Sequence, residues 1–155
     1  MDLNEAKEKA SRCLECKEPK CMEGCPIGIN IPKFIKYIKE DNLEEAYKII
    51  LEKSYFGAVC GRVCSHDIQC KGNCVQGNNG EPVDIGALEA FVSDWGLKNS
   101  NFKRENTLLN KERIAVIGGG PAGLTCAIKL ERMGYAVTLF EKTSDLGGIL
   151  QYRYS

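Results

Sequence analysis

Eight cysteines lie in two short sets in the first half of the chain. The first set has the spacing C-x2-C-x4-C-x3-C-P and comprises Cys13, Cys16, Cys21 and Cys25. The second set has the spacing C-x3-C-x5-C-x3-C and comprises Cys60, Cys64, Cys70 and Cys74. Thiols that stand this close along a chain can converge on a metal, and a [4Fe–4S] cluster takes four thiolates. The two sets therefore predict two [4Fe–4S] clusters.

The order of the cysteines predicts how they divide between the clusters. Bacterial ferredoxins use a related run, C-x2-C-x2-C-x3-C-P, in which the fourth cysteine ligates the other cluster. By that logic the first three cysteines hold one cluster, and Cys25 crosses to the second. By the mirrored argument Cys74 crosses back to the first cluster, while Cys64 and Cys70 join Cys25. The fourth ligand of the second cluster stays open, with Cys60 as the candidate by count.

Three other readings of the cysteines stay open. Zinc also binds four cysteines, in sites built from paired C-x2-4-C segments, and several pairs here fit that window. Disulfides and inert core thiols are the remaining alternatives, although the Cys-Pro ending favours iron–sulfur. We interpret His66 as a solvated loop histidine and Cys126 as a small core residue.

A glycine-rich turn in the last third of the chain indicates a second chemistry. Residues 118–123 read GGGPAG and match G-x-G-x-x-G. An apolar strand is predicted at 113–117, a helix at 124–133, and a second strand at 136–141 that ends on Glu141. The separation from Gly118 to Glu141 is 23 positions (141 − 118), near the ~20 expected of a dinucleotide-binding βαβ unit.

Each residue of this turn has a predicted part in binding a dinucleotide. Gly118 permits the tight turn, Gly120 lets the backbone approach the pyrophosphate, and Gly123 lets helix and strand pack closely. Pro121 and Ala122 complete the turn, where the helix N-terminus faces the phosphates.

An acidic residue at the end of the second strand selects among dinucleotides. Glu141 is expected to accept hydrogen bonds from the ribose hydroxyls, which disfavours NADP at this turn and leaves FAD or NAD. Gly148 either allows a further close approach to the ligand or belongs to an ordinary loop. An empty Rossmann-like turn is the alternative reading of the whole segment.

Composition adds limits on partners. The chain has 155 residues, with 21 acidic and 21 basic side chains, so charge does not point to nucleic acid or a membrane surface. The sequence shows no apolar run of membrane-spanning length, and its first residues lack the apolar core of a signal peptide. We therefore expect a cytoplasmic protein, in which clustered thiols favour metal binding over disulfides.

The remaining patterns divide the chain. Helices are predicted at 4–16, 31–38, 43–51 (capped by Asp41 or Asn42) and 84–95 (ending at Gly96). We expect an α-helical cluster domain at 1–100, a polar linker at 101–112, and at 113–155 the N-terminal βαβ fragment of an FAD/NAD(P)-binding Rossmann domain. The predicted fold is thus an α-helical two-cluster ferredoxin-like domain followed by the start of an α/β Rossmann-type domain.

The order of these motifs resembles a known group of flavoproteins. The sequence has the same order of segments as the glutamate synthase small (β) subunit group. These segments are the first cysteine set, the IPKFI helix, the CGRVC set, the PVDIGALEAF helix and RIAVIGGGPAGL. Dihydropyrimidine dehydrogenase's N-terminal region and the large subunit of NADH-dependent ferredoxin:NADP oxidoreductase belong to the same group. The resemblance covers nearly the whole chain. It implies that NAD(P)H reduces FAD, and that two [4Fe–4S] clusters then pass single electrons to a large catalytic or ferredoxin-type partner subunit.

The resemblance also implies a ligand set. The ligands of the first cluster would be Cys13, Cys16, Cys21 and Cys74. The second would be held by Cys25, Cys64 and Cys70 with Glu89 of the GALEAF segment, which leaves Cys60 as a buried non-ligand. The resemblance assigns no general base or nucleophile to this part.

One departure from the family is large. The family's FAD domain continues well beyond the point where this sequence stops, at Ser155. We therefore expect an incomplete FAD site, no activity of this fragment alone, and self-association of the truncated Rossmann part, because two strands rarely form a stable sheet. A non-catalytic, metal-stabilised helical module that docks a partner subunit is the rival function.

Overall fold

The computed structural model describes residues 1–99 and 112–153 of the chain. The chain divides into two compact units, Met1–Asn101 and Phe102–Ser155. Within the first unit the helices are α1 (Leu3–Ser11), α2 (Lys20–Glu23), α3 (Ile31–Lys39), α4 (Leu43–Leu51), α5 (Gly57–Val63) and α6 (Ile85–Asn99). Two 3₁₀ helices, η1 (His66–Ile68) and η2 (Val75–Asn79), follow α5. The predicted linker at 101–112 lies, except for Glu112, outside the described residues.

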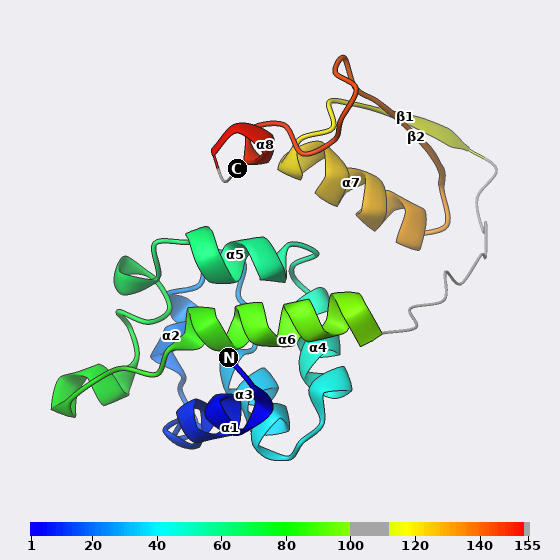
Figure 1. Cartoon of the computed structure of the whole chain (residues 1–155). Helices are drawn as coiled ribbons and strands as arrows, with labels where there is room; N and C mark the ends of the chain where they lie inside the picture. The colour runs from blue at the N-terminus through cyan, green and yellow to red at the C-terminus, as the bar shows by residue number, and fades with distance from the viewer. Residues whose placement is uncertain (100–111, 154–155) are drawn as a thin grey trace. The chain divides into compact units, whose positions relative to one another are not determined.

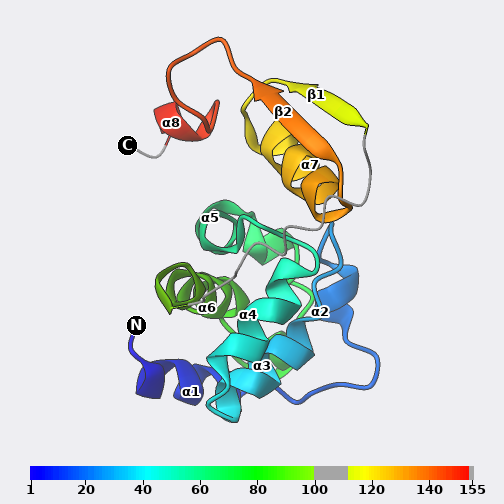
Figure 2. The same ribbon diagram turned by 90° about the vertical axis from the view of Figure 1, so that its right-hand side faces the viewer.

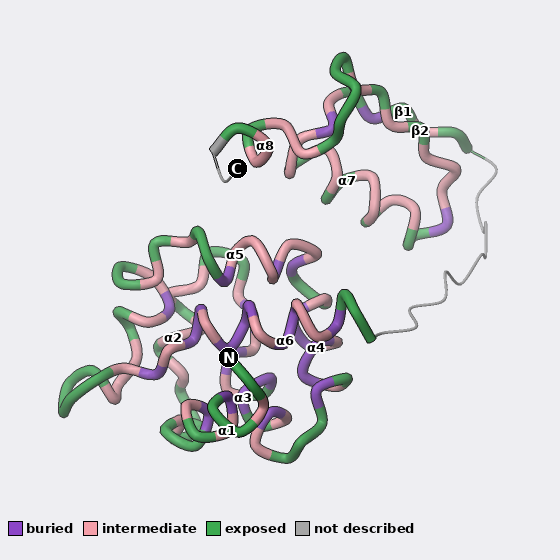
Figure 3. The backbone as a smooth tube through the Cα atoms, in the orientation of Figure 1, coloured by how far each residue is buried: buried purple, intermediate pink, exposed green. Residues whose placement is uncertain are grey.

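The helices of the first unit enclose one apolar core. Helix α6 packs against α1, α3, α4 and α5, and α3 packs against α1 and α4 (Figure 1). Phe34, Ile35 and Ile38 on α3 are fully buried, as are Ile50 on α4 and Leu88 on α6. Figure 3 shows the buried backbone of this unit gathered where these helices meet. This core fixes the helices from which the cysteine loops leave.

Two helix predictions are confirmed almost to the residue. Helix α3 begins at Ile31 with Pro32 in its first turn, where a missing N–H costs nothing. Helix α4 spans the predicted residues, and its N-cap is Asn42, whose side chain accepts a hydrogen bond from the Glu45 N–H at 3.2 Å.

Two predicted helix ends are wrong. The first helix stops at Ser11 and does not continue to Cys16, and Glu15 within the predicted span has a positive φ of 50°, outside the helical region. Helix α6 runs past Gly96 to Asn99. A Cβ at Gly96 would overlap the ring of Tyr47, so this glycine serves helix packing and not helix termination.

The second unit contains the predicted βαβ arrangement. Strands β1 (Arg113–Ile117) and β2 (Ala136–Phe140) pair in parallel, with Arg113 opposite Ala136 and Ile117 opposite Phe140. They are joined by α7 (Pro121–Arg132), which begins three residues earlier than predicted, and α8 (Leu150–Arg153) follows (Figure 2). Ile117 and Phe140 are 87% and 56% exposed, so little of this sheet is covered.

No helix among the described residues is long and apolar enough to cross a membrane.

Candidate functional site

The cysteines stand at the ends of helices and in the loops between them. Cys13 follows the end of α1 and donates its N–H to the Ala10 carbonyl at 3.0 Å. Cys21 lies on the short helix α2. In the second set, Cys60 lies on α5, Cys64 caps the C-terminus of that helix in an extended conformation, and Cys74 precedes η2. The helix ends and the loops that follow them therefore determine where the cysteine thiols lie.

Four cysteines from both sets form a first donor group. Its members line one cavity together with apolar residues that include Pro32 and Val83, and they are Cys13, Cys16, Cys21 and Cys74. Burial, together with the neighbouring Cys13 and Cys74, raises the pKa of Cys21 to about 12. Burial also raises the pKa of Cys13, with Cys16 and Cys74 again among its neighbours. Residues 61 positions apart (74 − 13) thus meet at one site.

A second donor group contains four cysteines and one carboxylate. Its members interact electrostatically with one another, and they are Cys25, Cys60, Cys64, Cys70 and Glu89. Burial, together with the charges of Cys60 and Glu89, raises the pKa of Cys64 to about 11. Burial raises the pKa of Cys70 to about 11 as well, with Cys25 and Glu89 contributing. The Cys25 thiol therefore lies with the second set, and Cys74 with the first.

Glu89 is the most unusual side chain of the second donor group. It lies on α6, is only 6% exposed, and its Oε1 atom is buried without a hydrogen-bond partner. Burial raises its pKa to about 7. A buried acidic oxygen without a partner is costly unless it binds a cation or a hydrogen-bond donor. Glu89 therefore has the chemistry of a metal ligand.

The donor groups fit iron–sulfur clusters in chemistry and in number. Each contains at least four donors, and thiols with raised pKa values release their protons when a metal binds. Within the described residues, no three His, Cys, Asp or Glu side chains are arranged to hold a single metal ion. In a [4Fe–4S] cluster each ligand binds a different iron atom, so the ligands do not converge on one point.

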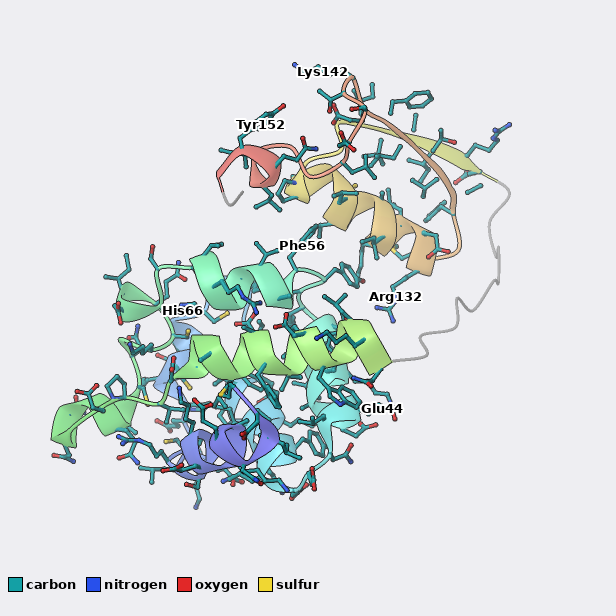
Figure 4. The ribbon with its side chains drawn as sticks, viewed as in Figure 1. Glu44, Phe56, His66, Arg132, Lys142 and Tyr152 are labelled. Atoms are coloured by element: carbon teal, nitrogen blue, oxygen red, sulfur yellow. The ribbon has the colours of Figure 1, made fainter. Side chains whose placement is uncertain are left out.

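An open cavity of about 750 Å³ lies beside the second donor group. Cys64 lines it together with residues of α5, η1 and α6, including His66. His66, labelled in Figure 4, is half-buried: its Nε2 atom is buried without a hydrogen-bond partner, and a Cβ on Gly86 would clash with its ring. The interpretation of His66 as a solvated loop residue is therefore wrong, because its ring packs against α6. No spacing in the sequence pairs His66 with Gly86.

The glycines of the dinucleotide turn have distinct local geometries. Gly118 has a φ of +102°, which disfavours any side chain. A Cβ at Gly123 would overlap the carbonyl oxygen of Gly118, so α7 packs directly on the turn. A Cβ at Gly120 would meet nothing within 4 Å, which leaves its backbone open to a ligand. Gly148 has a φ of +55°, and a Cβ there would stand 3.0 Å from the Gly120 Cα.

Glu141 already has hydrogen-bond partners within its own loop. Its carboxylate accepts from the Gly119 N–H at 2.6 Å, the Lys142 N–H at 2.7 Å and the Thr143 N–H at 3.0 Å. The hydrogen bonds from Gly119 and Thr143 are the main cause that lowers its pKa to about 2. The residue predicted to hold a ribose thus also ties β2 to the glycine turn. Pro121 and Ala122 form the first turn of α7.

Cys126 is exposed, which corrects the prediction of a core residue. It lies on α7, a helix without any buried residue. The two strands beside this helix provide too little surface to bury its side chains.

Comparisons with known proteins agree with this arrangement. Residues 1–101 match the family model for dihydropyrimidine dehydrogenase domain II, 4Fe-4S cluster, and residues 116–153 match an NAD(P)-binding Rossmann-like domain. The chain is 39% identical to the glutamate synthase [NADPH] small chain of Azospirillum brasilense over 154 residues, covering 95% of this chain and 31% of that protein.

A second relative is the NAD-dependent dihydropyrimidine dehydrogenase subunit PreT of Escherichia coli (strain K12). Its identity is 36% over 144 residues, which cover 93% of this chain and 35% of that protein. The chain thus spans about a third of the length of these curated relatives. It belongs to the family that includes dihydropyrimidine dehydrogenase domain II and the glutamate synthase small subunit, with a 4Fe-4S domain followed by the start of a Rossmann-like NAD(P)-binding domain.

Proposed function

We propose that this chain is the N-terminal electron-transfer part of an NAD(P)H-dependent FAD/iron–sulfur oxidoreductase. The observation that supports it most directly is the exchange of Cys25 and Cys74 between the two donor groups. Each group draws thiols from both cysteine sets, as the two-cluster pattern predicted from the spacing requires.

The proposed ligands follow the two donor groups. Those of the first cluster are Cys13, Cys16, Cys21 and Cys74, and those of the second are Cys25, Cys64, Cys70 and Glu89. The unpartnered Oε1 atom of Glu89 favours it over Cys60, whose thiol has Ser54 and Cys64 as partners. When bound, such clusters accept and release single electrons at potentials set by ligands, burial and hydrogen bonds.

The chain's own residues control access to these sites. The cavity of the first group is lined by apolar side chains as well as thiols, which limits water around the metal. Cys64 of the second group lines the open cavity between α5 and α6. The second site is therefore our proposed point of electron exchange with a partner.

The glycine turn supports a flavin dinucleotide at the start of the second unit. The backbones of Gly120 and Gly148 lie close together, and neither residue has a side chain. The first N–H groups of α7 suit a pyrophosphate. We propose FAD here, with the remainder of its site supplied outside these residues. NAD(P)H as electron donor and a larger catalytic or ferredoxin-type partner subunit complete the proposal, in line with the names of the relatives. We also propose a cytoplasmic location, because clustered free thiols favour metal binding in a reducing compartment.

Metal analysis of the chain purified without oxygen tests this proposal. We expect about eight iron and about eight sulfide per chain, since two cubane clusters contain that many. The protein should be brown, and dithionite should bleach its broad visible absorbance. A colourless protein with stoichiometric zinc would contradict electron transfer and support a docking module in which metal serves structure only.

A further inference from the structure

The second donor group contains one donor more than a cluster uses. A [4Fe–4S] cluster takes four protein ligands, one for each iron. Around this site stand the four side chains proposed as ligands and, in addition, the thiol of Cys60. The role of Cys60 as this fifth donor rests on the proposed function.

Cys60 is placed in direct contact with a proposed ligand. It lies on α5 four residues before Cys64, the C-cap of that helix, whose N–H donates to the Cys60 carbonyl at 3.1 Å. The two thiols are close enough to shift each other's pKa, and the Cys60 Sγ atom stands 3.9 Å from the Ser54 Oγ atom. Cys60 thus stands beside the metal site without a ligand role in the proposed set.

The crossing of α5 and α6 brings Cys60 close to Glu89. A Cβ at Gly61 would stand 2.6 Å from the Ala90 backbone nitrogen and 2.7 Å from the Gly86 carbonyl oxygen, so the two helix backbones touch. Gly61 is the neighbour of Cys60, and Ala90 is the neighbour of Glu89. The charge of Glu89 accordingly acts on the Cys60 thiol.

The two competing donors differ in chemistry. Glu89 offers a hard carboxylate oxygen, whereas Cys60 offers a thiolate, which is the softer ligand and the usual one for iron–sulfur clusters. The buried Oε1 atom of Glu89 has no protein partner that would hold it away from the metal. A side chain of this kind can bind iron and can also be replaced by a neighbouring thiol.

We propose that Cys60 is a reserve ligand of the second cluster, which binds the fourth iron whenever Glu89 does not. In this exchange the iron–oxygen bond to Glu89 breaks and an iron–sulfur bond to Cys60 forms. The proton of the Cys60 thiol passes to the released carboxylate, or to water when that carboxylate is absent. No electron is transferred in the exchange, so no external oxidant or reductant is needed.

A double-mutant comparison on the full 155-residue chain tests this proposal. Wild type, Cys60→Ala, Glu89→Ala and the double variant are purified without oxygen, and iron and sulfide are counted per chain. Each single variant should keep about eight iron, because one of the two donors remains, while the double variant should lose about half of its iron. Cys126→Ala, which removes an exposed thiol in the other unit, is the matched control and should keep about eight iron.

Electron paramagnetic resonance of the dithionite-reduced proteins adds a readout that folding alone does not change. Glu89→Ala should alter the spectrum of one cluster only, since its ligand changes from oxygen to sulfur, whereas Cys60→Ala should leave the signal shapes as in wild type. Circular dichroism of the double variant checks that its helices are kept.

Three results would overturn the reserve role. They are loss of half of the iron in Glu89→Ala alone, the same loss in Cys60→Ala alone, or full iron content in the double variant. Each would show that Cys60 does not replace Glu89, and each leaves the two-cluster function standing. Wild-type protein without iron and sulfide would instead refute the proposed function itself.

Discussion

Gly61 lies where the backbones of α5 and α6 touch. A Cβ at this position would press on the backbone of α6 at Gly86 and Ala90, and backbone atoms cannot move aside as a side-chain tip can. We expect Gly61→Ala to lower the free energy of unfolding by about 1–3 kcal/mol, because overpacking outweighs the helix propensity gained from alanine. Chemical denaturation measured by circular dichroism checks this.

The same substitution should also weaken metal binding at the second site, since Cys64 caps α5 and Glu89 lies on α6, the two helices that it separates. Gly77→Ala is the control: the nearest atom to its added Cβ is 3.6 Å away, an ordinary contact. Equal stability of Gly61→Ala and Gly77→Ala would contradict the argued contact.

Glu141 is the residue for which the structure predicts a pH dependence. Its pKa is lowered from 4.5 to about 2, chiefly by the hydrogen bond from Gly119. A lowered pKa stabilises the fold fully above the unfolded value, and this contribution is lost as the pH falls through about 2. We expect the Glu141 carboxyl resonance to titrate near pH 2, and the Gly119 amide resonance to follow it.

Glu141→Gln serves as the control, because its amide cannot ionise and the Gly119 resonance should then stay constant over this range. A Glu141 carboxyl that titrates near 4.5, the ordinary value, would show that the loop hydrogen bonds do not persist in solution.

At the scale of the elements, α3 is the helix on which the first unit is built. Ile38 is fully buried among α1, α4 and α6, whereas Lys36 on the same helix is half-exposed and forms only a 3.8 Å ion pair with Glu40. We expect Ile38→Ala to lower the free energy of unfolding by about 2–5 kcal/mol, from lost burial and a cavity.

Lys36→Ala removes a side chain of similar length from the same helix and should change stability by less than ~1 kcal/mol, because surface ion pairs contribute little. Urea denaturation of both variants measures the difference. Similar losses would mean that α3 does not pack on the core as described.

Local patterns predicted some elements well and failed where tertiary contacts decide. The bounds of α4 follow from its apolar periodicity and the Asn42 cap, both of which are written in the local sequence. The end of α1 was not predicted correctly, because a run rich in Ala, Glu and Lys does not indicate the left-handed backbone conformation at Glu15. Gly96 was misread because only the fold brings the Tyr47 ring against it.

The candidate sites show the same division. The cysteine spacing predicted which thiols gather at each site, because ligand geometry constrains sequence separation. The burial of Glu89, the thiol contact of Cys60 and the placement of His66 depend on how α5 crosses α6. In the sequence, only the family resemblance indicates Glu89 as a ligand, since no local pattern distinguishes it from other glutamates.

At the scale of the whole molecule, the first unit is expected to be self-sufficient. The described residues of its apolar core all lie between Leu3 and Trp95. A shortened chain of residues 1–101 should therefore fold and keep about eight iron per chain. Iron analysis and circular dichroism of this piece, beside the full chain as control, measure both properties. Loss of iron on shortening would show that the second unit contributes to the sites.

The sharing of cysteines between the two sets has a consequence for the topology of the first unit. A cut in the segment between α4 and α5, near Ser54, would leave residues 13–25 on one peptide and residues 60–89 on the other. Neither peptide alone would then contain all the donors of either site. The two clusters would then link the two peptides through their ligands. Removal of iron by a chelator would therefore favour separation of the peptides.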